Sequence, residues 1–247
     1  MNKLPQLTIA FWIMKICATT LGETAGDLLS MTLHIGYGLS SLILISFFFI
    51  SLGIQLFSKK HHPFIYWAVI LATSTAGTTM SDYMDRTLGL GYSTGSLILV
   101  CALVCILLLW RYNEKSISVS EIKSRKGEIF YWMAILFSNT LGTAFGDYVA
   151  DDSGLGFLGG ALLIGSVLGV LTVAHYYSKI SSILLFWLAF VLTRPFGAMF
   201  GDLLTKSTEK GGLNFGTIGA STILLTILVA LIITSTVQIT KSQAKSA

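Results

Sequence analysis

One pattern recurs four times along the 247-residue chain and strongly limits what the chain can fold into. An aromatic residue directly precedes a Trp, an Asp follows that Trp by 15 residues, and a Gly stands five residues before the Asp. The four sets, in chain order, are Trp12 with Asp27, Trp67 with Asp82, Trp132 with Asp147 and Trp187 with Asp202. Four units in one register indicate a duplicated structural unit.

Each unit contains two apolar runs of about 20 residues, which is the helix length that crosses a hydrocarbon core of about 30 Å. Hydrophobic residues make up 53% of the chain and charged residues only 11%, against about 25% charged residues in a soluble domain. So few charges exclude a soluble enzyme, a disordered chain and a nucleic-acid binder. We therefore expect an all-α, polytopic membrane protein with eight transmembrane helices.

The eight expected spans form four parallel helical-hairpin repeats within a single transmembrane domain, 1–247. The spans lie near 9–31, 38–57, 64–86, 93–112, 129–150, 157–177, 182–205 and 216–237, and the repeats cover 9–60, 64–115, 129–179 and 182–240. The first span of each repeat carries the polar motif, and the second is almost purely apolar. This asymmetry predicts an inner ring of first helices and an outer, lipid-facing ring of second helices.

The loops predict an orientation. The side of the termini and of the linkers between repeats carries eleven cations, which are Lys3, Lys59, Lys60, Arg111, Lys115, Lys123, Arg125, Lys126, Lys179, Lys241 and Lys245. The opposite side carries only Arg86, Lys206 and Lys210. By the positive-inside rule we expect a bacterial inner-membrane protein with both termini in the cytoplasm. The five Trp are then expected near the cytoplasmic interface as an aromatic belt.

The acidic residues gather in the other half of the repeats. An ionisable residue within a span costs about 2.5–3.5 kcal/mol and is by default functional, so Glu23 and the four motif Asp are the candidate cation ligands. Side chains four residues apart share a helix face. This spacing places Arg86 beside Asp82 and Lys206 beside Asp202 but gives Glu23, Asp27 and Asp147 no cation, so these three are expected to form the centre of the site.

Several further residues are candidate accessories to this site. An all-oxygen set of ligands suits hard cations such as Mg²⁺, Ca²⁺ or Mn²⁺. The hydroxyl and carboxylate oxygens near the motif come from Thr20, Thr24, Thr75, Thr78, Thr79, Thr140, Thr143, Asp85 and Asp151. Arg194 lies eight residues before Asp202 and is expected to pair with a carboxylate of another repeat or to gate the path. Lys15 is expected to snorkel to the interface or to act as a counter-ion for Glu23.

The runs FWIMKICATTLGETAGD and TRPFGAMFGD resemble a family of bacterial membrane proteins described only as uncharacterised, conserved and membrane-anchored, with four repeats of the Trp and Gly-x4-Asp pattern. The resemblance covers essentially the whole chain and implies no activity. The segment from Glu23 to Asp27 is also similar in its chemistry to the acidic signature of calcium/manganese–proton exchangers, although it has one extra residue, and Leu28 replaces the Lys or Arg. That family uses inverted three-helix repeats, so the likeness is one of chemistry.

We expect a secondary transporter of a metal cation, a divalent ion above all, with proton coupling through the same carboxylates. The alternatives are a passive channel with a ring of four Asp, an intramembrane aspartyl protease, and buried Asp residues that only pin the repeats together. The expected partners are an inorganic cation and the lipid bilayer, with no nucleic acid. No resident cofactor is expected, and a homodimer is compatible with the sequence.

Overall fold

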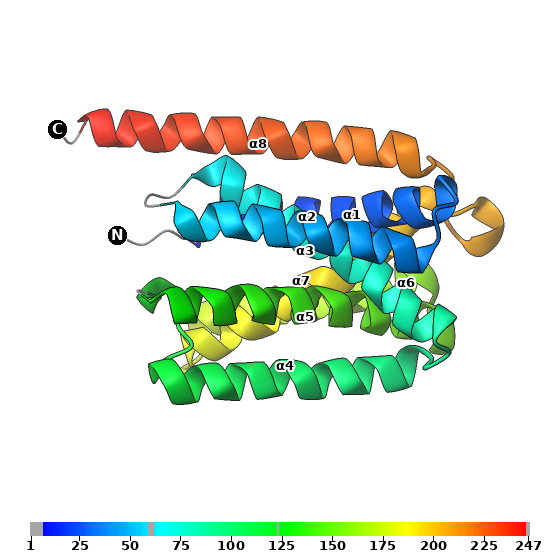
Figure 1. Cartoon of the computed structure of the whole chain (residues 1–247), viewed down its shortest axis with the longest axis horizontal. Coiled ribbons are helices and arrows are strands. Elements are labelled where there is room, and N and C mark those ends of the chain that lie inside the picture. The colour runs from blue at the N-terminus through cyan, green and yellow to red at the C-terminus, as the bar shows by residue number, and fades with distance from the viewer. Residues whose placement is uncertain (1–6, 59–61, 123, 246–247) are drawn as a thin grey trace.

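The computed structural model describes residues 7–58, 62–122 and 124–245 of the chain, with side chains up to residue 237 (Figure 1). The long helices of this described part are α1 (Ile9–Asp27), α2 (Tyr37–Phe57), α3 (Pro63–Asp82), α4 (Tyr92–Glu114), α5 (Arg125–Asp147), α6 (Gly156–Tyr177), α7 (Ser182–Thr205) and α8 (Thr217–Lys245). Short helical turns follow some of them, namely η1 (Leu28–Thr32), η2 (Tyr83–Thr87), η3 (Val119–Glu121), η4 (Tyr148–Asp152) and η5 (Thr208–Lys210).

The chain signals where several helices begin. The Thr8 hydroxyl accepts a hydrogen bond from the Phe11 amide at the start of α1, and the Ser124 hydroxyl accepts one from Gly127 at the start of α5. Both are N-caps, which satisfy amides that have no partner inside the helix. Pro63 opens α3, where its missing N–H costs nothing.

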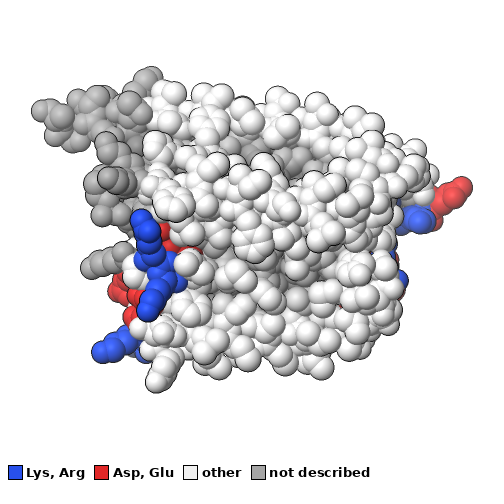
Figure 2. Space-filling model, in the orientation of Figure 1, with Lys and Arg blue, Asp and Glu red and all other residues white. Residues whose placement is uncertain are grey.

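Six of the eight helices are long and apolar enough to cross a membrane, namely α2 and α4 to α8. The face in Figure 2 agrees with this, because its charged side chains gather at the two ends and leave a broad uncharged band between them. The helices α1 and α3 do not meet the same criterion. Both lie inside the bundle, where their many Thr, Ser and acidic side chains are buried against protein. The chain is thus a helical membrane protein.

The helices form two concentric layers. The inner helices α1, α3, α5 and α7 contact one another in sequence and close into a ring, with α7 against α1. Each outer helix packs chiefly on the inner helix of the following repeat, so that α2 covers α3, α4 covers α5, α6 covers α7 and α8 covers α1. The two helices of one repeat are therefore separated, rather than packed together as a compact hairpin. Every repeat is completed by its neighbour, and the last is completed by the first.

The motif glycines are the points of closest approach between inner helices. A β-carbon on Gly22 would lie 2.1 Å from the Ser74 hydroxyl oxygen, and one on Gly197 would lie 2.4 Å from that of Thr19. In the same way, Gly77 meets the backbone at Asn139, and Gly142 meets the side chain of Arg194. Each Gly thus packs against the residue that stands eight positions before the Asp of the next repeat. The repeated Gly is explained by this close packing, in which no side chain fits.

Aromatic side chains from all four inner helices fill the interior at the end where these helices begin. Phe11 contacts Trp67, Tyr66 contacts Trp132, and Phe186 contacts Trp12, with ring centroids 5.4–5.9 Å apart. In the remaining position Trp110 of α4 packs edge-on against Trp187 and Tyr131. We call this set the aromatic layer. Four of the five Trp are at most 4% exposed, so the expected lipid-interface belt is wrong, since these rings pack against one another instead.

The beginning of α1 and the end of α8 lie at the same end of the molecule, beside the aromatic layer, and the Asp motifs lie toward the opposite end (Figure 1). Of the eleven cations on the terminal side, Lys3, Lys59, Lys60 and Lys123 lie outside the described residues, as do the side chains of Lys241 and Lys245.

Candidate functional site

The site is built from layers of side chains along the axis of the inner ring. Residues four apart on one helix share a face, and the repeat brings the same positions of four helices to the same depth. From the aromatic layer toward the Asp end, the layers are Lys15, Ile70, Ile135 and Phe190, then Thr19, Ser74, Asn139 and Arg194, then Glu23, Thr78, Thr143 and Ala198, and then the four Asp. The next layer carries Arg86 and Lys206.

The helix geometry changes directly after the Asp in three repeats. Asp27, Asp82 and Asp147 are each followed by a five-residue π-helical turn, in which the amides of Leu33, Leu88 and Ser153 bond to carbonyls five residues back at 2.9–3.0 Å. Such π-helical turns are rare in proteins, and many of those that occur lie at functional sites. In the fourth repeat α7 continues to Thr205, and the segment between the Asp and the aromatic residue that precedes the second apolar run is three residues longer than in the other repeats. The fourth repeat therefore presents its Asp on a regular helix.

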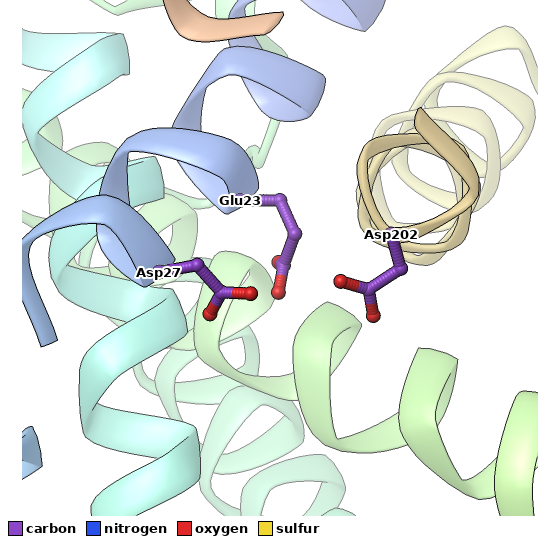
Figure 3. Close-up of side chains that lie close together, drawn as sticks. All are labelled: Glu23, Asp27 and Asp202. Atoms are coloured by element: carbon purple, nitrogen blue, oxygen red, sulfur yellow. The ribbon is translucent and has the colours of Figure 1, made fainter. Parts of the chain in front are cut away.

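Three acidic side chains from α1 and α7 converge at one point. Glu23, Asp27 and Asp202 each place a carboxylate oxygen within 4.8 Å of the others, and Figure 3 shows the three side chains pointing toward one another. All three are at most 4% exposed. Within the described residues this is the only group of three acidic, His or Cys side chains with that spacing. We call these three residues the carboxylate triad.

Lys206 covers the triad on the side of the last loop. Its ammonium bonds to Asp27 Oδ2 and lies 3.1 Å from Asp202 Oδ1, so one cation serves two carboxylates. The second contact is an ion pair without hydrogen-bond geometry. Burial lowers the pKa of Lys206, but the carboxylates of Asp202 and Asp27 raise it by more. The net pKa lies above the ordinary value, and Lys206 is protonated at neutral pH.

The other two motif Asp residues share Arg86 in a matching way. Arg86 Nε lies 2.9 Å from Asp82 Oδ1, and its Nη2 donates to Asp147 Oδ2 at 3.1 Å. Tyr37 accepts a hydrogen bond from Arg86 at 3.5 Å, and the guanidinium lies 5.6 Å from the centroid of the Tyr92 ring. Arg86 links repeats two and three as Lys206 links repeats four and one. The ring of four Asp thus has the twofold character that the alternation of cations indicates.

Arg194 occupies the centre of the ring, one level below the triad. It is fully buried, and its Nη2 donates to Glu23 Oε2 at 3.0 Å. The same nitrogen contacts the hydroxyls of Thr78 and Thr143 at 2.5 and 2.8 Å. Both hydroxyls in turn donate to Glu23 Oε2, at 3.2 and 3.4 Å. The prediction that Arg194 pairs with a carboxylate of another repeat is confirmed.

The expectation that Glu23, Asp27 and Asp147 carry no cation is wrong. Each of them pairs with a cation from another repeat, namely Arg194, Lys206 and Arg86 respectively. The sequence spacing reveals only pairs within one helix, whereas these ion pairs cross between helices. Every motif carboxylate thus has a tethered cation beside it, and two cations are shared by two Asp each.

Lys15 neither snorkels nor pairs with Glu23. Its side chain is fully buried, with the ammonium 3.4 Å from Asn139 Oδ1 and 4.0 Å above the centroid of the Phe190 ring. The Asn139 amide also donates to Thr73. Glu23 is occupied by Arg194 instead. The inner layers place Lys15 directly beneath Arg194, between the carboxylates and the aromatic layer.

Most of the predicted accessory residues lie away from the triad. The hydroxyls of Thr20 and Thr79 bond to carbonyls of their own helices, and Thr24 accepts a hydrogen bond from Ser221 on α8. Asp151 is exposed. Asp85 is buried, but its carboxylate packs against Gly95 of α4 and accepts from Ser81. Thr20, Thr24, Thr79 and Asp85 fall outside the four-residue register that runs from Glu23 to Asp27. Asp151 shares the register of Arg86 and Lys206 but lies exposed in η4.

Two of the threonines that the sequence offers as oxygen ligands, Thr78 and Thr143, do lie in the site, where their hydroxyls contact Glu23 and Arg194. Both stand four residues before their Asp, as Glu23 does before Asp27. The same spacing that singles out Glu23 separates these two from the other candidate threonines, because it places all three residues at one depth on the axis.

Chemically, the site offers carboxylate oxygens with neighbouring hydroxyls. The described residues around the triad supply no Cys or His. This donor set fits a hard cation such as Mg²⁺, Ca²⁺ or Mn²⁺. Such an ion would meet two tethered cations, Arg194 and Lys206, that already bind the same carboxylates.

Comparison with family models gives a match to the Repeat of Unknown Function (DUF347) in four copies, over residues 10–61, 65–116, 130–181 and 185–238. The chain therefore belongs to this repeat family, and the internal fourfold repeat is confirmed. Neither the curated proteins nor the solved structures yield a match.

Proposed function

We propose that this four-repeat membrane protein is a secondary transporter of a metal cation, with divalent ions as the first candidates. The observation that carries the proposal is the carboxylate triad, whose three buried acids bring their oxygens within 4.8 Å of one another. Buried acids inside a membrane bundle are costly and normally serve ion binding or transport. Their placement in two adjacent layers on the axis of a closed ring supports a transport path rather than a surface site.

Glu23, Asp27 and Asp202 are the proposed ligands, with Asp82 and Asp147 lining the path on the other side of the axis. Calcium and manganese fit because hard oxygen ligands suit them and because the segment from Glu23 to Asp27 is similar to the acidic signature of calcium/manganese–proton exchangers. The ion is the substrate, and the proposal includes no resident cofactor.

Lys206 and Arg86 act in this proposal as tethered counter-ions. Their side chains are 19% and 33% exposed, whereas the Asp carboxylates that they contact are at most 6% exposed. They therefore cover the acids on the Asp-motif side and hold them in place when no ion is bound. An incoming ion displaces them, which links ion binding to movement of the last loop and of η2.

The proposed setting is the bacterial inner membrane, with all eight helices spanning it and both termini in the cytoplasm. The polar side chains of α1 and α3 are buried inside the ring, which supports a transmembrane position for these two helices despite their composition. The Asp end of the ring then faces away from the cytoplasm.

Ion flux into proteoliposomes tests the proposal. A panel of Mn²⁺, Ca²⁺, Mg²⁺ and Na⁺ is offered with and without a pH gradient, and the expected result is gradient-dependent uptake of a divalent ion. Asp27→Asn is expected to abolish uptake without loss of expression, whereas Asp152→Asn, on an exposed acid outside the site, leaves it intact. Full uptake by a variant neutral at both Asp27 and Asp147 would overturn the proposal.

The same assay separates the alternatives. Flux that ignores the pH gradient favours a passive channel through the Asp ring. The stacked ion pairs on the axis speak against a permanently open channel, because Arg194 occupies its centre. Unfolding of the Asp27→Asn variant, in place of a folded protein without flux, would favour a purely structural role for the buried acids.

A further inference from the structure

Arg194 joins all four inner helices across the axis of the ring. It extends from α7, and its guanidinium donates to Glu23 and the Thr19 carbonyl on α1, to Thr78 and the Ser74 carbonyl on α3, and to Thr143 on α5. No part of the side chain is exposed. A cation moving along the axis past the triad would have to pass this guanidinium, which is both a steric and an electrostatic barrier.

The interior on the far side of Arg194 is filled as well. Lys15 lies beneath it with Asn139 and Phe190, and the aromatic layer follows, tightened by a 2.7 Å hydrogen bond between the hydroxyls of Tyr66 and Tyr131. On the opposite side the partly exposed Arg86 and Lys206 contact the carboxylates. The triad is therefore close to water at the Asp end and closed toward the aromatic layer.

Glu23 belongs both to the triad and to the Arg194 barrier. Its Oε2 accepts hydrogen bonds from Arg194, Thr78 and Thr143. No hydrogen bond from the described residues reaches Oε1, and the Glu23 carboxylate points toward Asp27 and Asp202 (Figure 3). A cation bound in the triad would be neutralised in part by the Glu23 carboxylate, which also neutralises Arg194. It would also repel the guanidinium, because two like charges would then share one buried anion.

We propose that Arg194 is the gate of the axial path, and that a cation bound by Glu23, Asp27 and Asp202 opens this gate by competing for the Glu23 carboxylate. The inference rests on the proposed cation site and adds how occupancy of that site is transmitted. In the free protein Arg194 locks the four inner helices together through Glu23. In the occupied protein Glu23 turns to the ion, and the guanidinium leaves the axis.

Thiol accessibility tests the gate directly. The reporter is Ile135→Cys in a background in which Cys17, Cys101 and Cys105 are changed to Ser. Ile135 is fully buried at the depth of Lys15, beyond Arg194 from the triad. A small neutral methanethiosulfonate is applied in detergent solution, and the labelling rate is measured with and without Mn²⁺. We expect Mn²⁺ to raise the labelling rate about tenfold or more, because an ion that binds the open state more tightly increases the population of that state.

Two variants of the reporter protein complete the test. Arg194→Gln is expected to label fast with or without Mn²⁺, whereas Arg111→Gln, at an exposed cation, behaves as the parent. The gate is overturned if Mn²⁺ binds, as shown by a raised melting temperature, but leaves labelling of the parent unchanged. It is also overturned if folded Arg194→Gln labels as slowly as the parent. The Mn²⁺ comparison on the parent needs no change at Arg194, so the proposal stays testable if that variant does not fold.

Failure of the proposed function gives a different result. If Mn²⁺, Ca²⁺ and Mg²⁺ all leave the melting temperature of the parent unchanged, the triad binds none of them, and the transport proposal fails together with the ion-driven opening. Slow labelling of Arg194→Gln beside clear Mn²⁺ binding removes only the gate and leaves the cation site standing.

Discussion

At the scale of single residues, two neighbouring threonines show how finely the helix register selects the site. Thr78 and Thr79 are adjacent and equally buried, yet only the Thr78 hydroxyl bonds to Glu23 and Arg194. The Thr79 hydroxyl bonds only to carbonyls of its own helix. The difference of 100° between successive helical residues decides which of them reaches the axis.

Thr78→Val should therefore damage the site, and Thr79→Val should not. Valine has nearly the same shape, so the change removes a hydroxyl from a buried network around an ion pair, at a cost of about 1–3 kcal/mol. We expect a lower melting temperature and slower cation uptake for Thr78→Val. Equal effects of the two substitutions on uptake would show that the network around Glu23 has no role in transport.

Lys206 and Lys210 offer a second matched pair, in one loop. Lys206→Gln leaves Asp27 and Asp202 without their shared cation, and two close buried carboxylates repel each other. We expect this variant to melt at a lower temperature in the absence of ions and to gain more than the parent from added Mn²⁺, because ligand binding stabilises the folded state. Lys210→Gln, at an exposed position, is the control. A Lys206→Gln variant that melts and responds as the parent does would contradict the role of Lys206 as a tethered counter-ion.

Part of the site could be predicted from the sequence, and the rest depends on contacts between helices. The register of the four Asp and the position of Glu23 one turn before Asp27 follow from spacing alone. The need of Arg194 for a carboxylate follows from its place within an apolar span. The partners of Arg86 and Lys206 across the ring do not, because Asp147 and Asp27 are 61 and 179 residues away from them in sequence. The expectation for Lys15 is wrong, because the snorkelling rule holds for a long side chain that can reach the interface. Lys15 is instead fully buried between the inner helices, against Asn139 and Phe190.

At the scale of helices, the closed ring depends on backbone contacts at the motif glycines. The separation of polar first helices and apolar second helices was visible in composition and predicts inner and outer layers. The packing of each outer helix on the inner helix of the next repeat does not follow from composition, because composition does not specify which inner helix an apolar helix contacts. The glycines then fix how near the inner helices approach and how deep the axial residues lie.

Gly142→Ala tests this close approach. Its new β-carbon would lie 2.2 Å from Arg194 Cγ, so α5 and α7 must move apart or Arg194 must shift. Such overpacking costs about 1–3 kcal/mol, and we expect a clear drop in melting temperature. Gly169→Ala is the control, because nothing lies within 4 Å of its new methyl group on α6 and Ala favours a helix over Gly by about 1 kcal/mol. A melting temperature of Gly142→Ala as high as that of Gly169→Ala would contradict the packing described for the inner ring.

At the scale of the whole molecule, the basic residues gather at the end with the termini and the acidic motif residues lie toward the other end. This uneven distribution of charge predicts the orientation of the bundle in the membrane. Ser153, after η4, and Ser178, after α6, are exposed at opposite ends of the bundle. We expect Ser153→Cys in the cysteine-free background to react with a membrane-impermeant maleimide on intact cells, and Ser178→Cys to react only after the membrane is opened. The reverse pattern would place the Asp end in the cytoplasm and contradict the positive-inside assignment.

The central claim is that one divalent cation binds among Glu23, Asp27 and Asp202, and electron paramagnetic resonance titration of the purified protein with Mn²⁺ measures this most directly. The account predicts one saturable site per chain that disappears in the double variant Asp27→Asn, Asp202→Asn and persists in Asp152→Asn. Equal Mn²⁺ binding by the double variant and the parent, or no binding by the folded parent, would contradict it.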